Sequence, residues 1–331
     1  MSERLPHIPN PDDAFAGAAA GNDTALPPTY FDRPLLKAPH WGWNVVTYLF
    51  LGGIMGGLGL IALLADERRE DERRLRRTAR FASLALAAAN PAILISHLGR
   101  PERFLHMLRI VKFKSPMSLG VWGLVLYSGV AGANVVRELS EVRVLPRWMR
   151  HLAPGVLTPL QALLGAFIAG YTGVLLSATA NPLWGAGKRH IPAISVTSGA
   201  ASACALASFL SVLGDNHDVV RRLERLELVA SAAELALLVD FRRHASRYGD
   251  PLFTGTRGER LYSMTIVTGI VAPAALNLIG AVVALPKPLD RLRTIAASAL
   301  TLLGGYMLRD TLIEAGKASA QDPHAGAIQP R

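Results

Sequence analysis

Hydroxyl, amide and imidazole side chains stand near the ends of several long apolar segments, and these are the groups that could do chemistry. Asn44 and Tyr48 lie one helical turn apart at the start of the first segment. Tyr171 lies late in a central segment, and Ser195 and Ser198 lie early in the next one. Such groups at the edge of an apolar bundle suit an amphipathic ligand with carbonyl or hydroxyl oxygens, such as a quinone. The alternative is that the aromatic side chains only form the interfacial belt of a membrane protein.

Two further residues are candidates for handling protons. His97 lies at the exit of an apolar segment, shortly before Arg100, and imidazole exchanges protons near neutral pH. Glu234 lies well inside another segment, where an ionisable side chain is costly and commonly functional. The alternative for Glu234 is a hydrogen-bonded role in helix packing. We therefore predict His97 and Glu234 as the catalytic, proton-handling residues.

About eight apolar segments must position these side chains. Four of them contain no charged residue: 43–65, 117–136, 153–180 and 191–213. Four others complete the set: 79–97, 226–239, 261–285 and 294–308. A helix of about 20 apolar residues crosses the hydrocarbon of a bilayer, and a helix satisfies its own backbone there. The sequence therefore predicts an all-α fold, a polytopic transmembrane bundle of about eight transmembrane helices.

Composition supports this fold and excludes other classes of protein. Of the 331 residues, 50% are hydrophobic and 18% are charged, where a soluble domain carries about 25% charged residues. The net charge of +10 comes from loops, so it indicates membrane topology rather than nucleic-acid binding. Cys204 is the only cysteine, which excludes an internal disulfide and a cysteine-ligated iron–sulfur cluster. None of the nine histidines lies near the middle of a segment, so we predict no haem and no bound metal.

Charge and composition also divide the chain. We expect residues 1–40 to form a disordered or partner-docking tail, residues 41–315 the transmembrane domain, and residues 316–331 a flexible tail. Seven arginines lie between residues 68 and 80, in the loop after the first segment. Because basic loops stay in the cytoplasm, we predict a bacterial inner-membrane protein with this loop inside. An even number of segments then puts the termini and the polar side chains on the outer face.

Several short blocks resemble the NrfD/PsrC family, the integral membrane subunits of polysulfide reductase-like complexes. The most specific are LGRPERF at residues 98–104 and SPMSLGVW at residues 115–122. YLFLGG at residues 48–53 is similar to the family's first-helix motif. YTGVLLSA at residues 171–178 and PLW at residues 182–184 are similar to its fourth-helix motif. The chain departs from the family at His97, where relatives often carry Asp, and at Tyr48, where some carry His.

The resemblance implies a haem-free membrane subunit of an oxidoreductase, which binds menaquinone or ubiquinone and is not catalytic alone. It implies an iron–sulfur, ferredoxin-like partner and a molybdopterin-type catalytic subunit. By analogy, Asn44 and Tyr48 lie near the quinone and Tyr171 hydrogen-bonds it. The predicted quinone-binding residues are Asn44, Tyr48, His97, Arg100, Tyr171, Ser195 and Ser198.

Two other functions are compatible with the same segments. Glu234 and the basic loops would fit a transporter or channel for protons or a small anion, although no internal repeat is evident in the sequence. A passive membrane anchor for a redox enzyme would need no ligand of its own. Bound quinone, or its absence, distinguishes these possibilities from the electron-transfer subunit.

Overall fold

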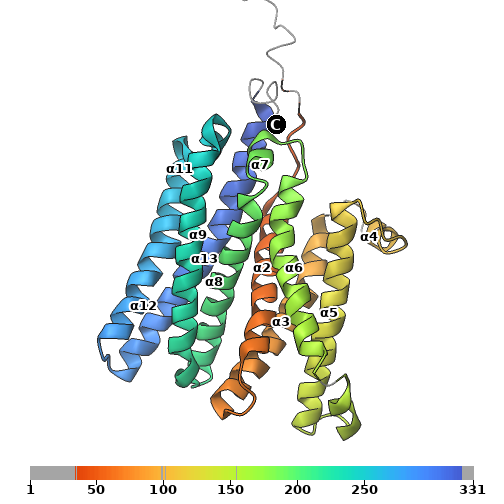
Figure 1. Cartoon of the computed structure of the whole chain (residues 1–331), viewed down its shortest axis with the longest axis vertical. Helices are drawn as coiled ribbons and strands as arrows, with labels where there is room; N and C mark the ends of the chain where they lie inside the picture. Colours follow the sequence, from red (N-terminus) through yellow and green to blue (C-terminus); the bar gives the residue numbers. More distant parts are fainter. Residues whose placement is uncertain (1–33, 35, 98–99, 101, 154, 323–331) are drawn as a thin grey trace, which may run out of the picture. The chain divides into compact units, whose positions relative to one another are not determined.

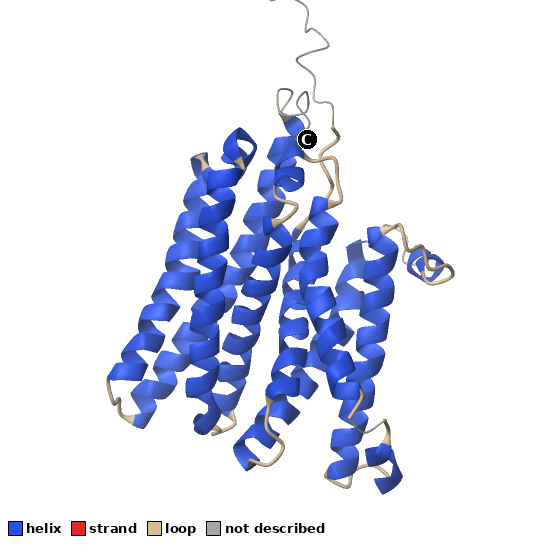
Figure 2. Cartoon of the chain, viewed as in Figure 1, coloured by secondary structure: helices blue, strands red, loops and turns tan. Residues whose placement is uncertain are grey.

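Long helices make up almost all of the chain that the computed structural model describes, namely residues 34, 36–97, 100, 102–153 and 155–322. Figure 2 shows helices joined by short connections, and no strand occurs in the described residues. The long helical runs are α2 (Trp43–Leu64), α3 (Glu70–His97), α5 (Pro116–Glu141), α6 (Leu157–Ser177), α8 (His190–Leu213), α9 (Val220–His244), the continuous run of α11 (Gly255–Arg260), η6 (Leu261–Val271, a π-helix) and α12 (Ala272–Val282), and α13 (Lys287–Gln321).

Shorter helical turns connect these runs. They are α4 (Arg103–Met107), η3 (Arg147–His151), α7 (Pro182–Ala186), η4 (His217–Val219), η5 (Ser246–Gly249) and α10 (Asp250–Phe253). α5 begins where the Ser115 hydroxyl caps the helix and Pro116 supplies a pre-set backbone angle at its first position. α7 begins in the same way at Asn181 and Pro182.

Six described helices are long and apolar enough to cross a membrane: α2, α3, α5, α6, α8 and the run from α11 to α12. This confirms an all-helical membrane protein. α9 and α13, with 25 and 35 residues, are also long enough, but charged residues interrupt them. Among these are Glu227, Glu234 and Arg309, all of which are buried inside the protein. Their charges therefore face other helices and not lipid.

Several helices extend beyond their predicted segments; α3, for example, begins at Glu70 and not at residue 79. α9 and α13 extend well beyond the predicted segments 226–239 and 294–308, because their end turns carry charges that pair within the protein. α13 also continues to Gln321, past residue 315, where we expected the transmembrane domain to end. Most of the predicted tail at residues 1–40, and residues 323–331, lie outside the described residues.

α2 is the central helix, and it packs against α3, α6, α8 and α13. α2, α3, α5 and α6 form one group of helices (Figure 1). A second group contains α8, α9, α13 and the run from α11 to α12. Successive runs alternate in direction. One end of the bundle therefore holds the first turns of α2 and α8 and the last turns of α3, α6 and α13. We call this the upper end, as drawn in Figure 1, and the opposite end the lower end.

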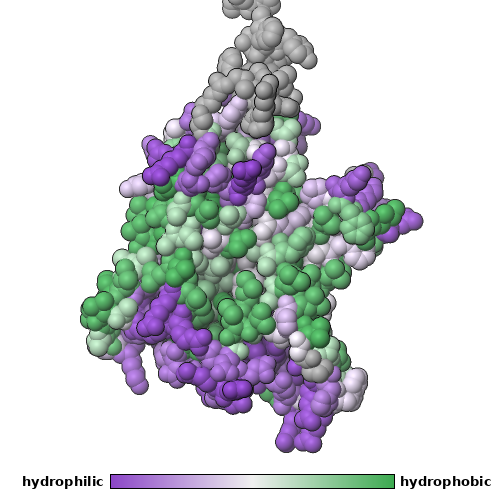
Figure 3. Space-filling view, viewed as in Figure 1, coloured by the Kyte–Doolittle hydropathy of each residue, from purple (hydrophilic) through white to green (hydrophobic). Residues whose placement is uncertain are grey.

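The surface is banded in the way that a membrane protein requires. Figure 3 shows apolar side chains across the middle of the visible face and hydrophilic side chains gathered at both ends. Large apolar side chains are exposed on the outer helices, among them Leu163, Val229 and Val282. A soluble protein rarely leaves so much contiguous apolar surface in water, so this band is the surface that lipid covers.

Glycines let α2 approach its neighbours backbone to backbone. A Cβ atom added at Gly56 would overlap the Gly165 carbonyl oxygen on α6, and one added at Gly53 would lie 3.3 Å from the Cα atom of Gly199 on α8. Because lipid is as apolar as leucine, helices in a membrane associate through such close packing between small residues. The glycine-rich run at residues 52–59 therefore holds the centre of the bundle together.

Replacing Gly56 with alanine should lower the free energy of unfolding by about 1–3 kcal/mol, the usual cost of overpacking a tight interface. The measurement is thermal unfolding of the chain in mild detergent. Gly129→Ala is the matched control, because nothing lies within 4 Å of the Cβ position on Gly129 of α5. Equal melting temperatures for the two variants would contradict this account of α2.

A buried ionic network joins α3 and α5 near the lower end. Glu138 is 1% exposed and pairs with Arg80 at 2.5 Å and with Arg76 and Arg77 at 3.4 Å. Arg80 also donates to the Thr158 hydroxyl on α6 at 2.5 Å. Arg76 and Arg80, two of the seven arginines between residues 68 and 80, are thus buried in the bundle.

Candidate functional site

Three of the predicted quinone-binding side chains gather at the upper end of the first helix group. Asn44 on α2 donates from Nδ2 to the Ser96 hydroxyl on α3 at 3.0 Å. Tyr48, one turn further along α2, is close enough to Tyr171 on α6 for the two phenol groups to interact electrostatically. The fold therefore brings Tyr171 to the same place as Asn44 and Tyr48, although it follows them by more than 120 residues in sequence.

The start of α5 forms the support for Tyr171. The Tyr171 hydroxyl donates to the Pro116 carbonyl oxygen at 2.7 Å, and its ring lies against Gly120 one turn later. Any side chain at Gly120 would overlap the ring. Pro116 and Gly120 both belong to the block SPMSLGVW, so this block fixes the orientation of Tyr171 as well as starting a helix.

The structure describes His97 and Arg100 only in part. α3 ends at His97, beside Ser96 and hence at the same end of the bundle as Asn44. The side chain of His97 and residues 98, 99 and 101 lie outside the described residues. Arg100 is exposed. The position of His97 in the chain is consistent with the predicted site, while its side-chain contacts stay a prediction.

Ser195 and Ser198 take part in a different polar cluster, around Arg309 of α13. Arg309 donates to the Ser198 hydroxyl at 2.6 Å and to the Ser195 carbonyl oxygen at 3.3 Å. The Ser195 hydroxyl donates within its own helix, to Ile191. α2 lies between the two clusters: Gly52 faces α3 and α6, while Gly53 faces Arg309 and α8.

Glu234 faces the same cluster from α9. It is 4% exposed, hydrogen-bonds Ser198 and interacts electrostatically with Arg309, which is 3% exposed. The Arg309 guanidinium also lies 5.8 Å from the centre of the Phe50 ring. Arg309 is a functional candidate that sequence reasoning missed, because it stands one residue beyond the predicted segment 294–308.

Further buried carboxylates continue from Glu234 toward the lower end. Glu224, Glu227, Ser231 and Glu234 are all buried and are spaced three or four residues apart, which puts them on one face of α9. Glu227 accepts a hydrogen bond from the Thr301 hydroxyl on α13 at 2.6 Å. The side chains of α9 and α13 therefore form a polar column that reaches from the lower end to the Glu234–Arg309 pair.

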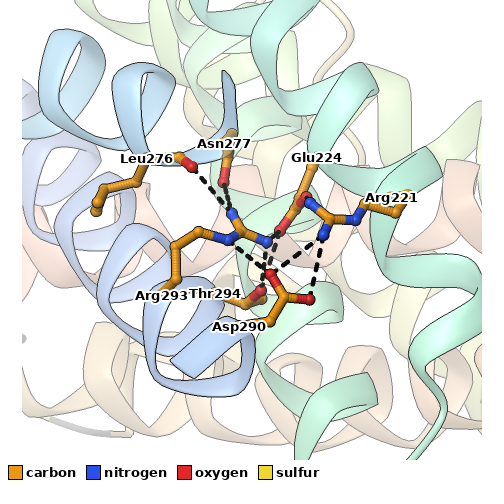
Figure 4. A network of polar contacts seen from close by, with 7 residues as sticks. All are labelled: Arg221, Glu224, Leu276, Asn277, Asp290, Arg293 and Thr294. Atoms are coloured by element: carbon orange, nitrogen blue, oxygen red, sulfur yellow. Dashed lines mark hydrogen bonds and ion pairs between the residues drawn. The ribbon is translucent and has the colours of Figure 1, made fainter. Parts of the chain in front are cut away.

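The lower end of this column is a closed network of charges (Figure 4). Arg293 of α13 donates to Glu224 at 2.6 Å, to Asp290 at 2.9 Å and to the Asn277 side chain of α12 at 3.2 Å. Arg221 bridges Glu224 and Asp290 from the other side. Every ion in this network has a partner of opposite charge, so the network joins α9, α12 and α13 without leaving a buried charge unpaired.

Comparison with known protein families identifies the family to which this helical bundle belongs. Residues 35–320 match the family described as "Polysulphide reductase, NrfD". The chain belongs to the NrfD family. The match covers α2 to α13 almost completely, including all five blocks that carry the resemblance in the sequence.

The chain is also similar in sequence to one curated protein of this family. The chain is 28% identical over 229 residues to the protein named "Protein NrfD" from Escherichia coli strain K12. The alignment covers 61% of this chain and 70% of that protein. The predicted NrfD/PsrC membership is thus confirmed, and the chain is a membrane component of the kind found in redox complexes.

Proposed function

We propose that this chain is the quinone- or quinol-binding membrane subunit of an oxidoreductase and exchanges electrons with a separate iron–sulfur subunit. The observation that carries the proposal is the convergence of Asn44, Tyr48 and Tyr171 at the upper end of an apolar bundle. Membership of a family described as polysulphide reductase supports it, since reduction of that kind needs an electron donor. The quinone pool is a donor dissolved in the same membrane.

The hydrogen bonds already made in this group favour the quinol form of the ligand. The Tyr171 hydroxyl gives its hydrogen to Pro116, so its oxygen is left as an acceptor. Asn44 uses one of its two amide hydrogens on Ser96 and keeps the other hydrogen, together with its carbonyl oxygen as a second acceptor. Both acceptors suit the hydroxyl groups of a quinol. A quinol supplies two electrons and two protons when it is oxidised.

The chain's own ionisable residues would take up and move those protons. His97, at the end of α3, is the residue that we assign to proton exchange beside Asn44. Glu234 and the column of carboxylates below it would carry protons between the middle of the membrane and the lower end. Arg309 stabilises the charge of Glu234 in a region where an unpaired carboxylate would be costly.

The proposed function includes a membrane topology for the chain and two partner subunits. α9 and α13 span the bilayer together with the six apolar runs, which gives eight transmembrane helices. The arginine-rich lower end faces the cytoplasm of a bacterial inner membrane, and Tyr171 lies toward the outer face. A ferredoxin-like iron–sulfur subunit docks at the upper end and passes electrons to or from a molybdopterin-type catalytic subunit.

Tyr171→Phe should slow electron exchange between a soluble quinol analogue and the partner's iron–sulfur clusters by about tenfold, the kinetic equivalent of one lost hydrogen bond. The measurement is the absorbance of the clusters in the purified complex after quinol is added. The helical content and the assembled complex should be unchanged.

Tyr262→Phe is the control, since Tyr262 is 65% exposed on η6 and lies outside the proposed site. Equal electron-transfer rates in Tyr171→Phe and the wild-type protein would remove Tyr171 from the quinone site. Loss of assembly in Tyr171→Phe alone would assign Tyr171 a structural role at Pro116 instead.

The polar column of α9 favours one rival function, proton transport without electron transfer. That function predicts proton flux through vesicles that contain the isolated chain and no quinone. The electron-transfer subunit predicts flux only when quinol is being oxidised.

A further inference from the structure

Two histidines and an aspartate meet at the upper ends of α8 and α9. His190, the first residue of α8, bonds through Nε2 to one carboxylate oxygen of Asp240 at 2.9 Å. His244, one turn beyond Asp240 on α9, approaches the other carboxylate oxygen through Nδ1 at 3.1 Å and lies 2.9 Å from the backbone carbonyl oxygen of Asp240 through the same atom. The two imidazole rings are stacked, with their centres 5.6 Å apart.

The neighbours of this group hold it in place. The His190 ring stacks on the buried Phe241 ring at 5.4 Å, which fixes the side of α9 that His190 faces. Asp240 and His244 are four residues apart, so they share a face of the helix. His190 is mostly buried, with 16% of its side chain exposed, while Asp240 and His244 are open to water at 48% and 65%. An ion from solution can therefore reach the group.

The chemistry of these three groups is that of a metal site. One ligand atom from each residue lies within 4.8 Å of the other two. A divalent transition-metal ion binds imidazole nitrogen and carboxylate oxygen at about 2.0–2.2 Å, so the three groups need only a small contraction around an ion. Binding would replace the contact of His244 Nδ1 with the Asp240 backbone carbonyl oxygen, and the exposed side chain of His244 has room to turn.

We propose that His190, Asp240 and His244 bind one divalent transition-metal ion of the Zn²⁺ class, with the remaining coordination position open to water. The proposal is independent of quinone binding. It also changes our expectation from the sequence, which was that the chain binds no metal: His190 and Asp240 are 50 residues apart, and no spacing motif connects them. A bound ion would join the start of α8 to the end of α9.

Isothermal titration of the untagged chain in mild detergent with ZnCl₂ tests the proposal. We expect one Zn²⁺ per chain, a rise in melting temperature on binding, and visible absorption bands of four-coordinate cobalt when Co²⁺ replaces Zn²⁺. His190→Gln and His244→Gln should each weaken Zn²⁺ binding by about tenfold or more, since even the loss of a group that only supports a metal ligand has that effect.

His217→Gln is the matched control. His217 lies at the lower end in η4 and pairs with Asp215 at 3.8 Å, and no third ligand completes that pair among the described residues. His217→Gln should bind Zn²⁺ as the wild-type chain does. Absence of saturable binding, or equal affinity in all three variants and the wild-type chain, would overturn the proposal. His244 is mostly exposed, so His244→Gln gives a result even if His190→Gln fails to fold.

Discussion

Replacing Glu138 with alanine is expected to lower the free energy of unfolding by about 3–5 kcal/mol, the largest effect of any single substitution proposed for this chain. Glu138 is the shared partner of Arg76, Arg77 and Arg80. Arg76 and Arg80 have side-chain exposures of 5% and 2%, so neither can turn to water once the carboxylate is gone. Arg80 would then be left buried without a carboxylate partner, while Arg76 would keep Glu67 and the more distant Glu141.

Thermal unfolding in mild detergent measures this effect, and Glu141→Ala is the control on the same helix. Glu141 is 38% exposed and reaches Arg76 only at 3.9 Å, so its removal should cost little. A second test replaces Glu138 and Arg80 together with leucine, which should recover much of the loss because a matched apolar pair can substitute for a buried ion pair. A melting temperature for Glu138→Ala close to that of Glu141→Ala would contradict the network's role.

Arg309→Met is the second large effect, with an expected loss of about 1–3 kcal/mol, because buried polar groups on α8 and α9 would lose a partner. It would leave Glu234 buried beside α8 without its positive neighbour, and it would remove the hydrogen bond to Ser198. Adding Glu234→Gln to Arg309→Met should restore part of the stability, because the glutamine carries no charge. Arg109→Met, at an exposed arginine, is the control for the loss of an arginine.

The single variant Glu234→Gln distinguishes a packing role of Glu234 from a role in proton transfer. Glu234→Gln alone should fold, since Gln is nearly the same size and still bonds Ser198, but it cannot exchange a proton. We expect it to lower steady-state quinol turnover in the complex by about tenfold or more, the range for loss of a proton-transferring side chain. Normal turnover in Glu234→Gln would leave Glu234 with a packing role only.

The fold was largely predictable from hydropathy, and the exceptions have one cause. Segments without charges, such as 43–65 and 191–213, correspond closely to α2 and α8. The lengths of α9 and α13 were underestimated because charged side chains on the two helices pair with each other. Glu224, for example, pairs with Arg293 across 69 residues of sequence. A hydropathy profile counts such charges as though they faced lipid.

The candidate site was predictable only in part. Alternating helix direction was enough to put Asn44, Tyr48 and Tyr171 at the same end of the bundle, as the structure has them. It could not separate them from Ser195 and Ser198, because the rotation of α8 about its axis depends on its packing against α2 and α13. Arg309 contacts Ser198 over a separation of 111 residues, and no local pattern marks that contact.

The measurement that tests the central proposal most directly is purification of the untagged chain from mildly solubilised bacterial membranes with an antibody, followed by assays for iron and quinone. The proposed function predicts that an iron–sulfur protein and quinone are recovered with the chain, and that Tyr171→Phe retains the iron but holds less quinone. A chain recovered alone, without iron or quinone, would contradict the proposal and favour a transporter.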